Sequence, residues 1–154
     1  MVTVKDLLAK LIRAEANMDS DFDAIMKIVE NEILELNREE QLFKEGIGTD
    51  GRLLGVYSKA TESITEGATG VGFPKRAGEP YNFYNTGEMF KSFALKVGKD
   101  SFEIFNTSRS IKEFSKTKNI SEDRIIGLTE PNQKEIELQR IMPLLREFFK
   151  RNIN

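Results

Sequence analysis

The chain has 154 residues, of which 39% are hydrophobic and 31% charged, and its formal net charge at pH 7 is −2. These proportions are typical of a globular protein and favour a single folded domain over residues 1–154. The chain has no cysteine and no histidine, which excludes disulfides, thiol nucleophiles, Cys/His zinc sites and Ser–His–Asp triads. We therefore expect no enzyme activity, no cofactor and no metal site.

Residues 1–45 are predicted to form a helical N-terminal part in two pieces. Leucine and isoleucine side chains fall on one helical stripe over residues 4–16. The polar run at residues 17–20 predicts an interruption and supplies an N-cap for the next helix. The apolar residues of this second helix recur three or four positions apart, so we expect it to continue until Gly46.

Residues 46–108 are predicted to contain the loops and the strands. The glycines and prolines of residues 67–80 predict a long surface loop, because neither residue type sustains a helix or a central strand. A short helix follows, for which Asn85 or Thr86 is a suitable cap. Alternating side chains then predict a β-hairpin with strands at residues 93–97 and 102–105.

The last part of the chain is predicted to end in a long helix. Residues 109–126 are polar and are expected to hold one or two short helical turns. Thr129 is suited to cap the C-terminal helix over residues 129–154, and Pro143 should kink it. The predicted fold class is therefore α+β, with long helices packed on a small, mainly antiparallel sheet.

Charge is unevenly spread along the chain. Residues 1–45 contain six Lys/Arg and eleven Asp/Glu, whereas residues 91–124 contain eight Lys/Arg and five Asp/Glu. Two interpretations are open: the charges form separate solvated faces, or acidic and basic surfaces of neighbouring subunits meet head to tail.

Aromatic and basic residues gather around the glycine-rich loop, and they are the candidate interface: Phe73, Lys75, Arg76, Tyr81 and Phe83. Such a group suits a stacking platform for single-stranded nucleic acid, an interface with another protein, or packing within the chain. The loop lacks the Walker pattern of a phosphate site. The absence of a long apolar run gives no reason to expect membrane contact.

Three segments in this order resemble the phage virion morphogenesis and tail-completion family of small neck proteins. They are Gly48–Ser58 with Ala60-Thr61, the Thr-Gly motif Asn85–Phe93, and the hairpin Leu95–Phe105. The resemblance covers roughly residues 35–106. After it, Gly127–Glu130 and the long helix that follows resemble small structural proteins of phages that infect Bacteroidetes.

The resemblance implies a structural component of a bacteriophage particle, a head–tail connector, neck or tail-completion protein. Its partners would be other copies of itself in a ring and portal or tail proteins, with no small-molecule substrate and only indirect DNA contact. The virion would be its final location after assembly in the host cytoplasm. The motif residues Thr86, Gly87 and Ser92 would have structural roles. The alternatives are a phage-encoded regulatory module that contacts nucleic acid, and a carboxylate-based hydrolase.

Overall fold

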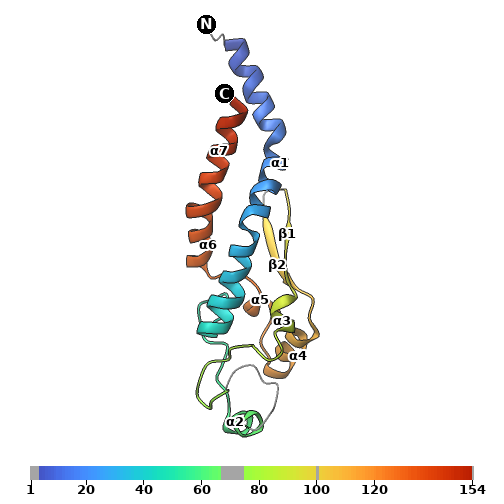
Figure 1. Cartoon of the computed structure of the whole chain (residues 1–154), viewed down its shortest axis with the longest axis vertical. Helices are drawn as coiled ribbons and strands as arrows, with labels where there is room; N and C mark the ends of the chain where they lie inside the picture. Colours follow the sequence, from blue (N-terminus) through green and yellow to red (C-terminus); the bar gives the residue numbers. More distant parts are fainter. Residues whose placement is uncertain (1–3, 67–74, 100, 154) are drawn as a thin grey trace.

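The longest element is an uninterrupted helix that runs along most of the length of the molecule, with α2 (Lys59–Thr65) lying beyond its end (Figure 1). In the computed structural model, which describes residues 4–66, 75–99 and 101–153, this helix comprises α1 (Val4–Glu35) and the π-helical segment η1 (Leu36–Glu45). It ends at Gly46, whose φ of 64° is left-handed, and glycine adopts that conformation without a steric penalty.

The predicted interruption at residues 17–20 is wrong, because the polar side chains there find partners that are compatible with a helix. Ser20 Oγ donates to the main-chain oxygen of Asn17 at 2.8 Å. The amide of Asn17 in turn donates to Asn152 Oδ1 at 3.2 Å, and Asn152 also bonds Asp21. A contact from the C-terminal end of the chain, made by Asn152, therefore supports the helix at the segment where the sequence predicts a break.

The second long helix is formed by α6 (Glu130–Ile136), η2 (Glu137–Ile141) and α7 (Met142–Ile153). It begins as predicted at Thr129, whose hydroxyl accepts from the N–H of Asn132 at 3.4 Å. The π-helical turn η2 lies immediately before Pro143, whose ring disturbs the preceding turn. The helix packs antiparallel along α1, so that both termini lie at one end of the molecule (Figure 1).

The predicted hairpin is confirmed as β1 (Phe93–Val97) and β2 (Phe102–Asn106), an antiparallel pair in which Leu95 lies opposite Ile104. Alternate side chains point inward, so Phe93 and Ile104 are buried. The hairpin packs on α1, on the side away from α6 (Figure 1). Long helices with a small antiparallel sheet make the fold α+β, as the sequence predicts.

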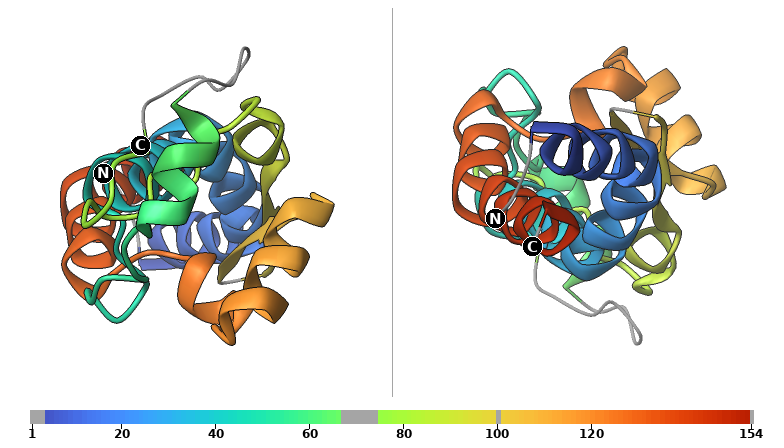
Figure 2. Two further views of the ribbon diagram at one scale, coloured as in Figure 1. Left: turned by 90° about the horizontal axis from the view of Figure 1, so that it is seen from below. Right: turned by 90° about the horizontal axis from the view of Figure 1, so that it is seen from above.

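Short helices gather at the end of the molecule opposite the termini (Figure 1, Figure 2). They are α2 (Lys59–Thr65), α3 (Glu88–Lys91), α4 (Arg109–Lys118) and α5 (Glu122–Ile125). The ten residues of α4 form more helix than the sequence predicts for this region, because Ile111 is 1% exposed and anchors the helix to the core.

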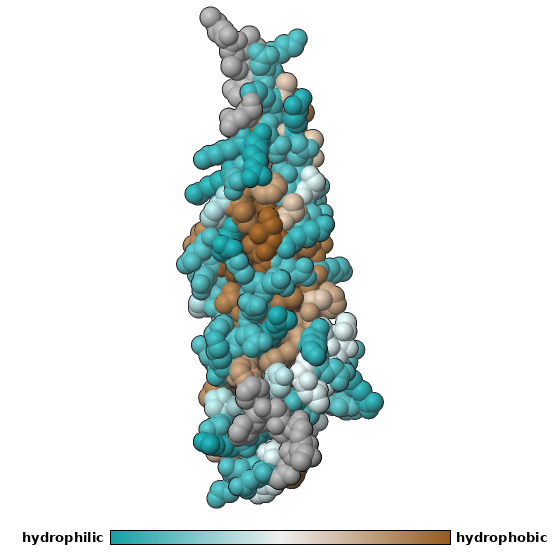
Figure 3. Space-filling model, viewed as in Figure 1, coloured by the Kyte–Doolittle hydropathy of each residue, from teal (hydrophilic) through white to brown (hydrophobic). Residues whose placement is uncertain are grey.

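The core lies where the two long helices, the hairpin and the short helices meet. Four residues of α1 have no exposed surface: Ile25, Met26, Val29 and Ile33. Side chains from all the other layers join them in one cluster, among them Phe90, Ile104, Ile125, Leu128 and Ile136. In the view of Figure 3, hydrophobic atoms still reach the surface at mid-height, between hydrophilic areas.

Candidate assembly surfaces

The aromatic residues of the predicted interface pack inside the chain. Tyr81 is only 9% exposed, and its ring lies 5.0 Å from that of Tyr57 and 5.3 Å from that of Phe114. Phe83 packs edge-on against Phe114 with 4.7 Å between the ring centroids. Phe73 lies outside the described residues. The rings of Tyr81 and Phe83 are thus occupied by intramolecular contacts, and a contact of this cluster with a partner stays a prediction.

Two lysines border the aromatic cluster. Lys75 Nζ lies 5.8 Å from the ring centroid of Tyr57, and Lys118 Nζ lies 5.3 Å from that of Tyr81. Burial lowers the pKa of Lys75 below its ordinary value. Arg76, by contrast, is exposed. Of the predicted interface residues that the structure describes, Arg76 is therefore the exposed one, and the charge of Lys75 is partly balanced by the aromatic face of Tyr57.

The Thr-Gly motif shapes the turn into the hairpin. Gly87, and not Asn85 or Thr86, is the N-cap of α3, with a φ of 79°. The hydroxyl of Thr86 accepts a long 3.4 Å bond from the N–H of Glu88. Ser92 is the C-cap of α3, and its hydroxyl donates to the Glu88 carbonyl at 2.9 Å. The positive φ of Gly87 favours glycine, and a Cβ at this position would lie 3.0 Å from Tyr84 Oη, so that the tyrosine side chain would have to shift.

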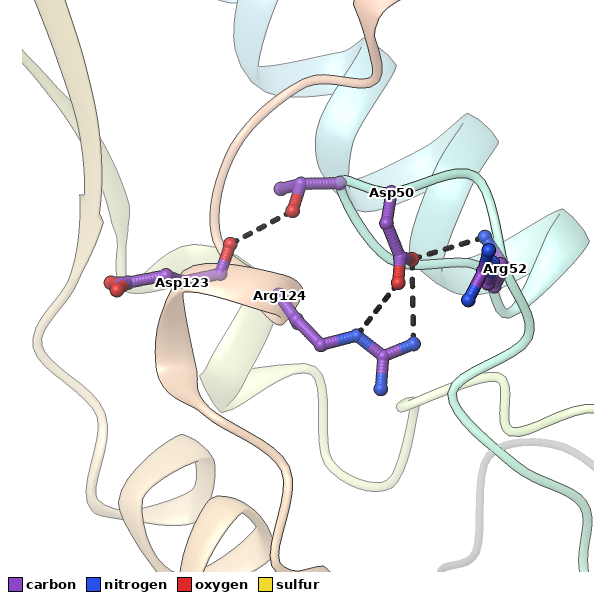
Figure 4. A network of polar contacts seen from close by, with 5 residues as sticks. Asp50, Arg52, Asp123 and Arg124 are labelled. Atoms are coloured by element: carbon purple, nitrogen blue, oxygen red, sulfur yellow. Dashed lines mark hydrogen bonds and ion pairs between the residues drawn. The ribbon is translucent and has the colours of Figure 1, made fainter.

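An ion-pair network joins the turn after η1 to α5 (Figure 4). Asp50 Oδ2 lies 3.0 Å from Arg124 Nε, and Asp50 Oδ1 accepts from the N–H of Arg52 at 3.1 Å. The hydroxyl of Thr49 donates to the Asp123 carbonyl at 3.0 Å. The Arg52 N–H, followed by the Arg124 guanidinium, lowers the pKa of Asp50. This geometry fixes the turn against α5.

Two buried amides hold the link before α6 against η1. Asn37 and Gln41 both donate to the carbonyl of Gly127, at 2.7 Å and 3.0 Å. Gln41 Oε1 also accepts from the N–H of Thr129 at 2.9 Å. Both amide side chains are fully buried, and burial without partners would be costly. No local pattern in the sequence indicates this arrangement, because the partners are distant in the chain.

An apolar surface remains uncovered at the end that carries both termini, where α1 runs past the end of α7 (Figure 1). Leu8 precedes Met26, and Leu11 precedes Val29, by 18 residues, which is five turns of 3.6 residues. Met26 and Val29 are fully buried, whereas Leu8 is 56% and Leu11 43% exposed. The apolar stripe of α1 therefore continues beyond the part that the rest of the chain covers.

Further apolar side chains adjoin this stripe, and we call the whole set the apolar end. Besides Leu8 and Leu11, it comprises Ile12, Met18 and Phe149, all more than two-fifths exposed. A groove of about 360 Å³ between α1 and α7 lies beside it, lined mainly by apolar residues that include Met18 and Phe149. Adjoining apolar residues of this kind are typical of a surface that another protein covers.

Opposite charges lie on different sides of the other end. The exposed residues of α4 include Arg109, Lys112, Lys116 and Lys118, with Glu113 the one acidic residue of that helix. A groove of about 830 Å³ between the end of η1 and the start of α6, which we call the acidic groove, is lined by five carboxylates. They belong to Glu40, Glu45, Asp50, Glu130 and Glu135. Three of them are paired with cations: Glu40 with Lys44, Glu130 with Lys134 and Asp50 with Arg124. α4 and α6 lie on opposite sides of the long helix (Figures 1 and 2).

Within residues 4–66, 75–99 and 101–153, no three or more acidic side chains are grouped closely enough to hold a metal ion. Over the same ranges, no helix combines the length and the apolar composition that a bilayer crossing requires. Comparison with known proteins found no match to this chain among family models, curated proteins or solved structures.

Proposed function

We propose that this protein is a structural component of a bacteriophage particle, a head–tail connector, neck or tail-completion subunit that works through contacts with other proteins. The observation that carries the proposal is the apolar end, where Leu8 and Leu11 extend the core stripe of α1 into solvent. An exposed stripe continuous with the core indicates a partner that completes the packing. The motif resemblance supplies the phage context.

The charge distribution supports a ring of copies. Basic α4 lies on one side of the subunit and the acidic groove on the other. When two different surfaces of identical subunits pair, the contact is heterologous and generates a closed ring or an open filament. In this arrangement α4 of one subunit faces the acidic groove of the next, and the apolar ends of the same neighbours pack side by side.

A charge-swap experiment tests the ring. Variant A carries Lys112→Glu and Lys116→Glu on α4, and variant B carries Glu45→Lys and Glu135→Lys in the acidic groove. We expect wild type to give one closed oligomer by native mass spectrometry, each variant alone to remain monomeric, and the equimolar mixture to form rings with an even number of subunits. Unchanged oligomers in A and B would contradict the proposed contact.

The phage assignment needs its own test. Gold-labelled antibody against this chain should bind purified particles at the junction of head and tail. Label restricted to the capsid or the tail tip, or found only on soluble material, would contradict the connector function and leave the ring test unaffected.

A second candidate function is supported by the cations at the aromatic cluster. Lys75 and Lys118 approach the rings of Tyr57 and Tyr81, and combined positive charge and aromatic surface favour single-stranded nucleic acid. This function predicts a fluorescence anisotropy increase with a short single-stranded DNA, weakening steeply as salt rises. Binding that is absent at low salt would eliminate it.

A further inference from the structure

The hydrogen-bond pattern of the hairpin shows which backbone groups of β2 face outward. The N–H of Gly98 donates to Ser101 at 2.7 Å, and the N–H of Thr107 donates to Ser92 at 3.3 Å. Hydrogen-bonded and non-hydrogen-bonded pairs alternate along an antiparallel ladder. Ile104, opposite Leu95, is therefore in a non-hydrogen-bonded pair.

It follows that the N–H and C=O groups of Phe102, Ile104 and Asn106 point away from β1. Within the part of the chain that the structure describes, the sheet has two strands, and no main-chain hydrogen bond joins Ile104 to another element. Such an edge is a template for an added strand, because its unpaired groups match those of any extended chain.

The inner side of this edge opens onto an apolar groove of about 480 Å³. β2 forms one wall, and η2 with the start of α7 forms the other. The apolar lining includes Phe22 from α1, Ile104 from β2, and Ile141 and Leu145 from the opposite helix. An added strand would direct every second side chain into this groove, so those side chains must be apolar.

The outer side of the same edge borders a hollow of about 430 Å³ with three carboxylates, those of Glu103, Glu122 and Asp123. Lys96 of β1 lies opposite Glu103 in the hairpin. Arg124, which follows Asp123, is paired with Asp50 on the other side of α5. The remaining side chains of an added strand would project toward these carboxylates, and lysine or arginine would complement them.

We propose that the free edge of β2 binds an extended segment of a partner protein as a third strand, in which apolar residues alternate with lysine or arginine. The main-chain groups of Phe102, Ile104 and Asn106 bind its backbone, the apolar groove takes its inward side chains, and the acidic hollow takes its outward ones. This surface is separate from α4, the acidic groove and the apolar end, so the inference does not depend on the ring.

The probe is a heptapeptide of alternating lysine and valine with blocked ends. We expect saturable binding to the full chain, followed by two-dimensional NMR, with slower amide hydrogen exchange at Phe102, Ile104 and Asn106. A peptide of alternating glutamate and valine should bind at least about tenfold more weakly, since it reverses the charge facing the hollow. A Lys/Val peptide with proline at the central valine should also lose affinity, because proline lacks the N–H.

Matched variants locate the site. Asp123→Lys together with Glu103→Lys should weaken binding at least about tenfold, whereas Asp19→Lys, distant on α1, should have no effect. The proposal is overturned if the Lys/Val peptide produces no saturable change, if the amides of β2 are unaffected, or if the proline peptide binds as well. Equal weakening by Asp19→Lys would show attraction to the overall charge only, and would also overturn it.

Discussion

The side-chain amide of Asn37 donates a 2.7 Å hydrogen bond to the main-chain oxygen of Gly127, although the two residues are 90 positions apart. Asn37 also donates to the carbonyl of Ile125 at 3.2 Å. These bonds attach the link between α5 and α6 to the long helix. In this link, Gly127 lines both the apolar groove and the acidic hollow beside β2. The hydrogen bonds of one buried amide therefore position both surfaces.

Replacing Asn37 with alanine should destabilise the fold by about 1–3 kcal/mol, because it leaves buried carbonyl groups with fewer donors. Chemical denaturation would measure the free energy of unfolding. Gln139→Ala, at an exposed position of η2, is the matched control and should change it by less than about 0.5 kcal/mol. Equal effects of both substitutions would show that the Asn37 bonds contribute nothing specific.

Asp50→Asn should lower stability at pH 7 but not in strong acid. The pKa of Asp50 is lowered from its ordinary 3.8, first by the Arg52 N–H and also by Arg124. A carboxyl whose pKa is lower in the folded state stabilises the fold above its unfolded pKa, and this contribution is lost as pH falls through the folded pKa. The difference between wild type and variant should therefore shrink below pH 3.8 in denaturation curves.

The control for this pH dependence is Asp123→Asn. In Figure 4 the carboxylate of Asp123 points away from Arg124, and only its carbonyl takes part in the network. This substitution leaves the Asp50–Arg124 pair in place, so introducing Asp50→Asn into the Asp123→Asn background should produce the same pH-dependent loss of stability as in wild type. A difference between wild type and Asp50→Asn that stays constant from pH 7 to pH 2 would contradict the ion-pair account.

Gly87→Ala should destabilise the protein more than Gly51→Ala. Both glycines have positive φ, 79° and 71°, so each substitution introduces strain of about 1–2 kcal/mol. A Cβ at Gly87 also meets Tyr84 at 3.0 Å, whereas nothing lies within 4 Å of a Cβ at Gly51. Thermal unfolding of the two variants separates the clash from the backbone strain, and identical melting temperatures would show that Tyr84 adjusts without cost.

The sequence predicts the elements whose signals are local. The hairpin follows from alternation within β1 and β2, and the start of α6 follows from Thr129 and the proline after it. The break predicted at residues 17–20 fails because Asn17 bonds Asn152, 135 positions away. A local pattern contains no information about such a partner, and the same holds for the bond between Asn37 and Gly127.

The sequence leaves the role of the candidate interface residues open, again for a physical reason. Aromatic side chains such as Tyr81 and Phe83 are equally suited to an interface and to packing, and the approach of Phe114 decides for packing here. The apolar end was not predicted, because Leu8 and Leu11 have the spacing of ordinary core residues. Only the structure shows that the covering layers end before them.

Limited trypsin digestion separates the two candidate functions. We expect the free chain to be cut first after Lys75 or Arg76, next to the segment in which Gly78 and Glu79 bond to Tyr57. Assembly into a ring should slow this cleavage if the loop contacts a neighbour, because ordering removes the local opening that proteases need. Protection by single-stranded DNA that disappears at high salt would instead favour the nucleic-acid module.

The most direct test of the central claim, that this chain works by assembly through its uncovered surfaces, is the mass of the protein in solution against concentration. Leu8→Glu combined with Leu11→Glu should raise the dissociation constant at least about tenfold by analytical ultracentrifugation, because each buried leucine contributes about 1.5–3 kcal/mol. Ile64→Glu, at a 75% exposed position of α2, should assemble like wild type. A wild-type protein that stays monomeric at all concentrations, or a Leu8/Leu11 variant that assembles unchanged, would contradict the account.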